Sequence, residues 1–140
     1  MPFMNTKKAS LLIGLAMLAP AVVSAHSTVS PSQSLTSKYE TFTLNVPTEK
    51  DIPTTAMRLV IPSGLERVTP IVKPGWRINV VKDENENVTE IRWSGGSIPA
   101  DQKDMFLFSA RTPAEPASLI WKVYQTYSDG EIIAWEQDPK

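Results

Sequence analysis

Tyr39-Glu40-Thr41-Phe42-Thr43-Leu44-Asn45-Val46 is a run in which polar and apolar side chains alternate without interruption. Successive side chains of a β-strand point to opposite faces, so Phe42, Leu44 and Val46 share one face while the polar residues share the other. The run therefore predicts a strand with one face in a core and the other in water.

The same alternation recurs along the chain between turn residues. Further runs lie at residues 27–30, 56–61, 76–80, 89–93, 105–110, 119–127 and 131–135. Polar residues 82–87 and Ser128-Asp129-Gly130 fit hairpin turns, which would make the last two strands neighbours. Together these runs predict an all-β fold, an immunoglobulin-like antiparallel β-sandwich of about eight or nine strands.

The N-terminal 25 residues differ from the rest. Lys7 and Lys8 precede an apolar run at residues 9–23, and small residues follow at Ser24 and Ala25. This pattern predicts a secretory signal peptide that is cleaved after Ala25. The apolar run is shorter than the roughly 20 residues that a membrane span requires, so we expect no membrane anchor after cleavage. The prediction is a single domain at residues 26–140, located in the periplasm or secreted.

Composition excludes several classes of function. The sequence contains no cysteine, which rules out thiolate chemistry and disulfides. Without Lys7 and Lys8, 12 basic residues face 15 acidic ones, a formal net charge of −3. A negatively charged domain of this kind is not expected to bind nucleic acid.

Cleavage after Ala25 would make His26, the only histidine, the first residue of the mature chain. The α-amine and the imidazole Nδ1 of an N-terminal histidine can bind one metal ion together and close a six-membered ring. Nitrogen donors of this kind favour Cu(II). The alternative is a surface histidine with no role. A single histidine cannot build sites that need two or more, and a serine–histidine–acid triad would have to use an exposed chain end.

The chain resembles the YcnI-like copper-binding proteins, exported bacterial domains long described as a domain of unknown function. The resemblance covers the mature chain and rests on these segments: His26-Ser27-Thr28-Val29-Ser30-Pro31, Tyr39-Glu40-Thr41-Phe42-Thr43, residues 46–55, Lys73-Pro74-Gly75-Trp76, Ile91-Arg92-Trp93-Ser94-Gly95-Gly96, residues 106–111, and residues 121–130 leading to Trp135.

The resemblance implies a Cu(II) site built on the N-terminal histidine alone, a one-histidine brace, with a carboxylate and a tryptophan nearby. His26 carries over directly, and Trp135 matches the tryptophan, unless it is simply a packing residue. The family's usual glutamate position is Met105 here. The third ligand is therefore open between Asp104, Glu115 and the thioether of Met105, which would favour Cu(I). The other tryptophans, Trp76, Trp93 and Trp121, are expected in the core.

The resulting hypothesis is a copper-binding protein for copper acquisition, trafficking or homeostasis, and not an enzyme. Its expected partners are the copper ion and a membrane copper transporter or another envelope copper chaperone. Two alternatives stay open at this point. One is an immunoglobulin-like interaction module of the cell envelope without a metal role, and the other is a copper enzyme that uses Trp135 in electron transfer.

Overall fold

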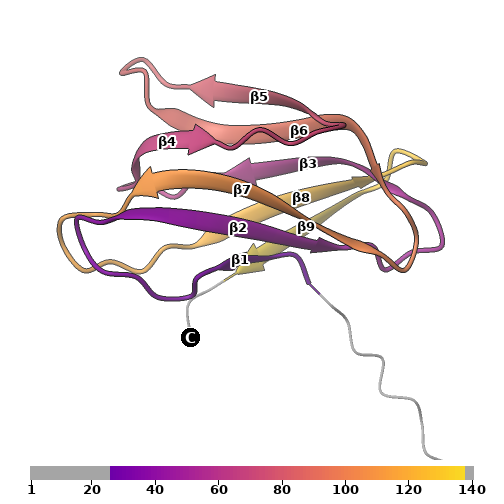
Figure 1. The fold of residues 1–140 in the computed structure, drawn as a ribbon, viewed down its shortest axis with the longest axis horizontal. Coiled ribbons are helices and arrows are strands. Elements are labelled where there is room, and N and C mark those ends of the chain that lie inside the picture. Colours follow the sequence, from indigo (N-terminus) through magenta and orange to yellow (C-terminus); the bar gives the residue numbers. More distant parts are fainter. Residues whose placement is uncertain (1–25, 138–140) are drawn as a thin grey trace, which may run out of the picture.

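A computed structural model describes residues 26–137, which form nine β-strands and no helix (Figure 1). The strands are β1 (Thr28–Ser30), β2 (Tyr39–Pro47), β3 (Thr54–Val60), β4 (Glu66–Pro70), β5 (Arg77–Lys82), β6 (Val88–Ile98), β7 (Lys103–Arg111), β8 (Trp121–Tyr127) and β9 (Ile132–Gln137). Within these residues there is accordingly no helix that could cross a membrane. The predicted signal peptide, residues 1–25, lies outside the described residues.

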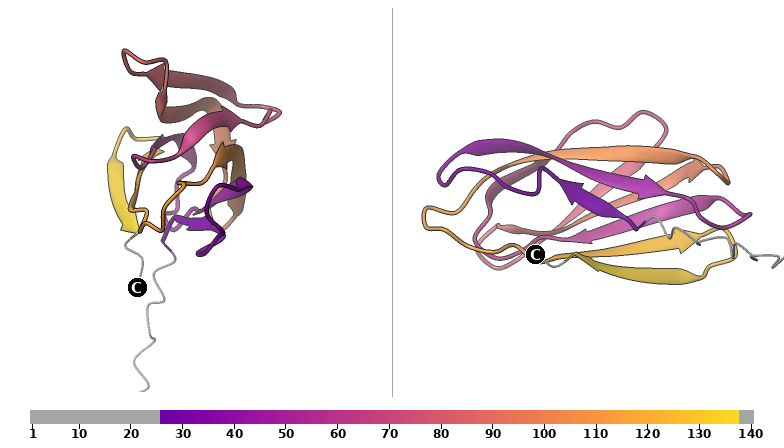
Figure 2. Two further views of the ribbon diagram at one scale, coloured as in Figure 1. Left: turned by 90° about the vertical axis from the view of Figure 1, so that its left-hand side faces the viewer. Right: turned by 90° about the horizontal axis from the view of Figure 1, so that it is seen from below.

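The strands form two antiparallel sheets that pack face to face (Figure 2). One sheet has the order β1-β2-β7-β4 and the other the order β5-β6-β3-β8-β9. β8 and β9 are hydrogen-bonded neighbours across the predicted Ser128-Asp129-Gly130 turn, where Gly130 has a φ of 88°. The structure confirms the predicted antiparallel sandwich.

The core lies between the sheets and includes the residues that the alternation assigned to it. Phe42, Leu44 and Val46 are all buried, and Trp93 and Trp121 are buried with them. Trp76 is partly buried and packs against this core. Burial of these apolar side chains is the main favourable contribution to folding in a chain without disulfides.

One strand was not predicted. In β4 only Val68 is buried, and the pairing of β4 with β7 is shifted between Glu66 and Thr69, where Arg67 has a φ of 52°. A bulged edge strand does not show the regular alternation from which strands are inferred. The boundaries also differ: β6 continues to Ile98, beyond the predicted end at residue 93.

The edges β1 and β9 of the two sheets lie side by side (Figure 1), and Gln137 joins them. Its side-chain Oε1 accepts a hydrogen bond from the Val29 backbone N–H at 2.6 Å, and its Nε2 donates to the Val29 carbonyl at 3.1 Å. The side-chain amide thus imitates a neighbouring strand. This closure holds the start of the described chain against β9.

Gly96 allows the Lys73–Trp76 segment to pack against the Ile91–Gly96 segment. A Cβ built on Gly96 would lie 2.2 Å from a ring carbon of Trp76, so only glycine leaves room for this indole. The Trp76 ring in turn packs edge-to-face on Phe106, with 4.9 Å between ring centroids. The Lys73–Trp76 and Ile91–Gly96 segments therefore meet over the Phe106 strand.

Candidate metal-binding site

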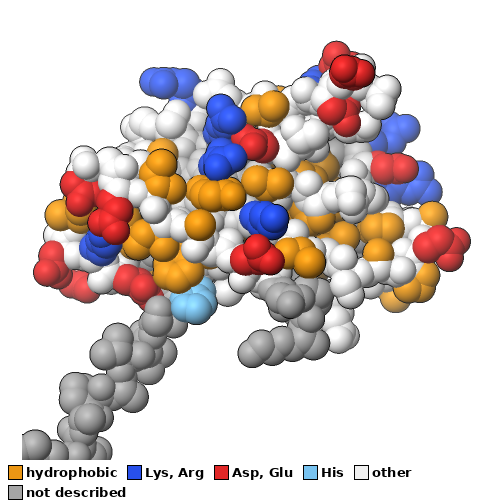
Figure 3. Space-filling view, turned by 180° about the vertical axis from the view of Figure 1, so that it is seen from behind, with side chains coloured by type: hydrophobic (Ala, Val, Ile, Leu, Met, Phe, Trp, Pro, Cys, Tyr) orange, Lys and Arg blue, Asp and Glu red, His pale blue; other side chains and the backbone are white. Residues whose placement is uncertain are grey.

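His26 lies at the edge of the sandwich, immediately before β1, and its ring stacks on Trp135 of β9. The ring centroids are 4.6 Å apart and the ring planes make an angle of 26°. His26 is exposed, and in Figure 3 its side chain, the only pale blue one, lies at the surface beside hydrophobic side chains. A stacked imidazole uses its face for the contact, so its two nitrogens, whose lone pair and N–H lie in the ring plane, are directed along the indole face and not at it.

The Trp135 indole is fixed on the side that faces the core. It pairs with Val123 in the β8–β9 ladder and points into the space between the sheets. Its Nε1–H donates to the side-chain Oε1 of Gln125 at 3.0 Å. The indole N–H is therefore engaged in the interior, and the ring face is what Trp135 offers to His26.

The structure places Asp104 and Met105 on β7, which is separated from β1 by β2. Two strand spacings amount to about 10 Å between backbones. The Asp104 carboxylate forms an ion pair with Lys73, which precedes β5 on the far side of β7, and accepts a hydrogen bond from the Met105 N–H at 2.8 Å. The Met105 side chain is 53% exposed.

Neither residue is brought to His26. Alternation along β7 turns Asp104 and Met105 to opposite faces, so they do not face one another either. Of the four residues predicted as metal ligands, His26 and Trp135 are the two that the structure brings into contact.

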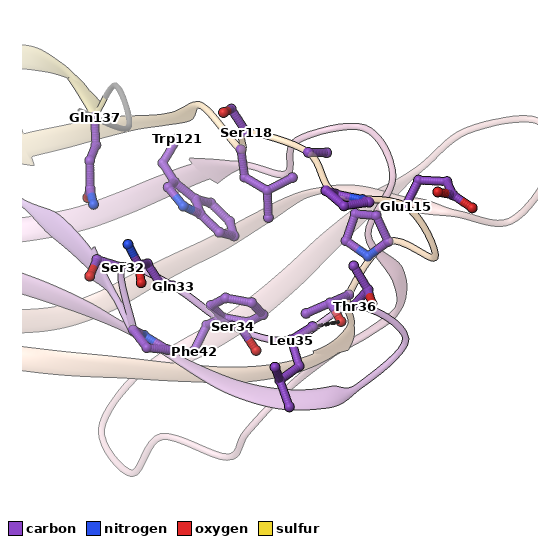
Figure 4. Close-up of a pocket in the computed structure, with 16 residues that line it drawn as sticks. Ser32, Gln33, Ser34, Leu35, Thr36, Phe42, Glu115, Ser118, Trp121 and Gln137 are labelled. Atoms are coloured by element: carbon purple, nitrogen blue, oxygen red, sulfur yellow. Dashed lines mark hydrogen bonds between the residues drawn. The ribbon is translucent and has the colours of Figure 1, made fainter.

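Glu115, the other candidate, lies at the opposite end of the sandwich. Its loop is tied to the start of β2 by the hydrogen bond from the Ser37 N–H to the Pro113 carbonyl, whereas the register of β1 places His26 near the end of β2. The length of β2 separates these ends by about 26 Å. Glu115 lines a cavity of about 810 Å³, where Phe42 and Trp121 approach from the core (Figure 4).

Histidine and carboxylate side chains do not cluster in groups of three or more that could hold a metal ion anywhere in residues 26–137. The nitrogens available at this edge are those of the His26 imidazole, to which cleavage before His26 would add its α-amine. That donor set suits a metal ion that accepts few nitrogen ligands with water or other weak donors, and Cu(II) is such an ion.

Sequence reasoning missed Gln125 and Gln137. Gln125 falls on the inward face of β8 between Val123 and Tyr127, and it is 1% exposed. A polar residue at an inward position of an otherwise apolar strand face was the signal that marked it, because such a group must be hydrogen-bonded.

Comparisons with known proteins agree with this fold and with the resemblance. The "Copper-binding protein CutI" of Bacillus subtilis (strain 168) is 34% identical over 131 residues, which are 91% of this chain and 63% of that protein. The chain thus spans less than two thirds of that relative's length. The crystal structure of an uncharacterized protein from Nocardia farcinica, described as immunoglobulin-like, matches with a TM-score of 0.71 and 26% identity over 82% of this chain and 86% of that one.

The immunoglobulin-like fold predicted from the alternation is confirmed by this match. A family model described as "Domain of unknown function (DUF1775)" matches residues 26–140, the same stretch that carries the segments of the YcnI-like resemblance. The chain therefore belongs to the DUF1775 family.

Proposed function

We propose that this protein is an exported copper-binding protein whose mature chain holds Cu(II) through the N-terminal histidine, His26. The observation that carries the proposal is the stack of His26 on Trp135, which fixes the only imidazole of the chain at an exposed edge. The name of the Bacillus subtilis relative, a copper-binding protein, supports the choice of metal.

The chemistry follows from what His26 gains when residues 1–25 are removed. A metal ion binds the unprotonated forms of an α-amine and an imidazole, so the two groups can bind one ion together once the α-amine of His26 is free. Bound together they form a one-histidine brace. Trp135 covers one face of the imidazole and contributes no nitrogen, since its N–H is bonded to Gln125.

The remaining coordination is left to water or to a donor from a partner protein. The Asp104 carboxylate forms an ion pair with Lys73, and Met105 lies on β7, two strand spacings away from β1 and His26. A site with one anchored residue and open positions suits a protein that takes up copper and passes it on. We therefore propose a role in copper acquisition, trafficking or homeostasis, in the periplasm or outside the cell, with a membrane copper transporter or another envelope copper chaperone as partner.

The test compares three mature chains: the wild type and His26→Ala, both purified after export, and the wild type with its α-amine acetylated. The acetylated chain keeps the imidazole of His26 but removes the α-amine as a metal donor. Cu(II) is titrated while its electron paramagnetic resonance spectrum is recorded. We expect both altered chains to lose at least about tenfold in affinity, or 1.4 kcal/mol, and to change the nitrogen hyperfine pattern. Unchanged spectra and affinity in both would refute the proposal.

A second function, an interaction module without a metal role, is favoured by the cavity at the other end of the sandwich. It combines the apolar Leu35, Leu119 and Trp121 with polar side chains from Ser32, Gln33, Ser34 and Thr36. Calorimetry separates the two functions, because an interaction module shows no saturable Cu(II) binding by the mature wild-type chain.

A further inference from the structure

A network of buried polar side chains, joined by hydrogen bonds, lies in the core directly beneath His26 and Trp135. Its members are Ser27, Thr48, Thr54 and Gln125, which are between 0% and 4% exposed. They come from the segment before β1, the β2–β3 connection, β3 and β8. A buried polar group that lacks a partner costs about 1–3 kcal/mol, so a core retains such a network only when its hydrogen bonds are complete.

The directions of the hydrogen bonds in this network are fixed by groups that can only donate or only accept. The Trp135 indole can only donate, and it donates to Gln125 Oε1 at 3.0 Å. The Pro47 carbonyl can only accept, and it accepts from Gln125 Nε2 at 2.9 Å. The amide of Gln125 therefore has a single possible orientation.

The other hydrogen bonds of this network can be directed too. Gln125 Nε2 also donates to Thr54 Oγ1 at 2.7 Å. Thr48 donates its only hydroxyl hydrogen to the Ile98 carbonyl at 3.3 Å, so the Thr54 hydroxyl donates to Thr48 Oγ1 at 2.8 Å. Each donor has its acceptor, which makes the network complete from the Trp135 indole to the backbone of β6.

Two of the groups that Gln125 holds belong to the candidate site. Besides the Trp135 indole, Gln125 Oε1 lies 3.4 Å from the Ser27 hydroxyl, and Ser27 is the residue next to His26. One buried amide oxygen thus contacts both sides of the stack: the ring on which His26 rests and the residue that carries His26 into β1.

We propose that Gln125 is the positioning residue of the site, which fixes the plane of the Trp135 indole and thereby the place of the His26 imidazole. Its effect on copper rests on the function proposed above, whereas its effect on the indole does not. Glutamine suits this position because it supplies an acceptor toward Trp135 and donors toward Pro47 and Thr54. Leucine supplies neither, and an ionised glutamate lacks the donors.

The first test needs no metal and reads the indole directly. In the ¹H–¹⁵N spectrum of the copper-free mature protein, the Trp135 Nε1–H should exchange slowly with deuterium. In Gln125→Leu it should shift and exchange at least about tenfold faster, since its acceptor is gone. The control is Thr112→Val, because Thr112 is 6% exposed and bonds to Leu35 and Lys38 at the opposite end of the sandwich.

The control variant should lower the free energy of unfolding without moving the Trp135 resonance. Rapid exchange of the Trp135 N–H in the wild type would overturn the proposal by itself, even if Gln125→Leu does not fold. An identical Trp135 resonance in a folded Gln125→Leu would overturn it as well.

The second test asks whether Gln125 acts through the indole. Cu(II) affinity is measured in Gln125→Leu, Trp135→Phe and the double variant. We expect Gln125→Leu to weaken binding about tenfold, as the loss of outer-shell partners of metal ligands does, and to add less than about twofold once Trp135 is phenylalanine. Independent, additive losses would refute positioning through Trp135. A wild type that binds no Cu(II) would refute the proposed function and leave the first test standing.

Discussion

The contact between Gly96 and Trp76 predicts that Gly96→Ala destabilises the fold when Trp76 is present and not when Trp76 is replaced by alanine. Gly96→Ala places a methyl group 2.2 Å from the Trp76 ring, so the ring must move. A tryptophan buries 150–250 Å² in a core. If the displaced, partly buried ring loses roughly 100 Å², the cost is about 2.5 kcal/mol at 25 cal/mol per Å². Restriction of the unfolded chain returns about 0.4–1 kcal/mol, which leaves a net loss of about 2 kcal/mol.

In the Trp76→Ala background nothing opposes the methyl group. Gly96 does not have a positive φ, so Gly96→Ala should then be neutral or stabilise the fold by up to about 1 kcal/mol. Gly95 is the matched control: its φ of 77° makes Gly95→Ala destabilising in both backgrounds. Urea unfolding followed by far-ultraviolet circular dichroism measures the wild type and the five variants. An equal loss for Gly96→Ala with and without Trp76 would refute the reasoning.

Two further predictions concern charged side chains. Burial, the largest single influence, raises the pKa of Glu90, but hydrogen bonds from Arg92 and Arg58 outweigh it and leave the pKa below 4.5. A lowered pKa stabilises the fold above the unfolded value, and the gain disappears as pH falls through the folded value. Glu90→Gln should therefore cost about 1 kcal/mol at pH 7 and progressively less as the pH is lowered below 4.5, measured by urea unfolding; a constant cost would contradict this. Asp104→Asn should leave Cu(II) affinity within about twofold by calorimetry, because Lys73 holds the carboxylate away from His26; a tenfold loss would make Asp104 a ligand.

Alternation was sufficient to predict most of the sandwich because its strands each bury one face. Phe42, Leu44 and Val46 are the clearest case, and all three lie in the core. The prediction failed for β4, where a positive φ at Arg67 and a register shift break the period of two that the inference depends on. Irregular edge strands leave no periodic signal in a sequence.

The sequence identified the two residues of the candidate site, His26 and Trp135, but not the contact between them. The position of His26 after the expected cleavage point marked one end, and the tryptophan beyond the Asp-Gly turn marked the other. Their contact depends on β1 and β9 meeting at the open side of the sandwich, which Gln137 secures through the backbone of Val29. Such a contact between the edges of two sheets is a property of the packing, so no spacing along the chain encodes it.

Positioning and chemistry are separable in this site. The stack on Trp135 uses the imidazole face, so the α-amine takes no part in the contact itself. The buried network under Gln125 likewise consists of groups that fold with the sandwich. The proposed cleavage before His26 would then add only the second nitrogen. A mature chain whose α-amine is acetylated should keep the slow exchange of the Trp135 N–H while it loses tight Cu(II) binding, and loss of both together would show that the amine also holds the stack.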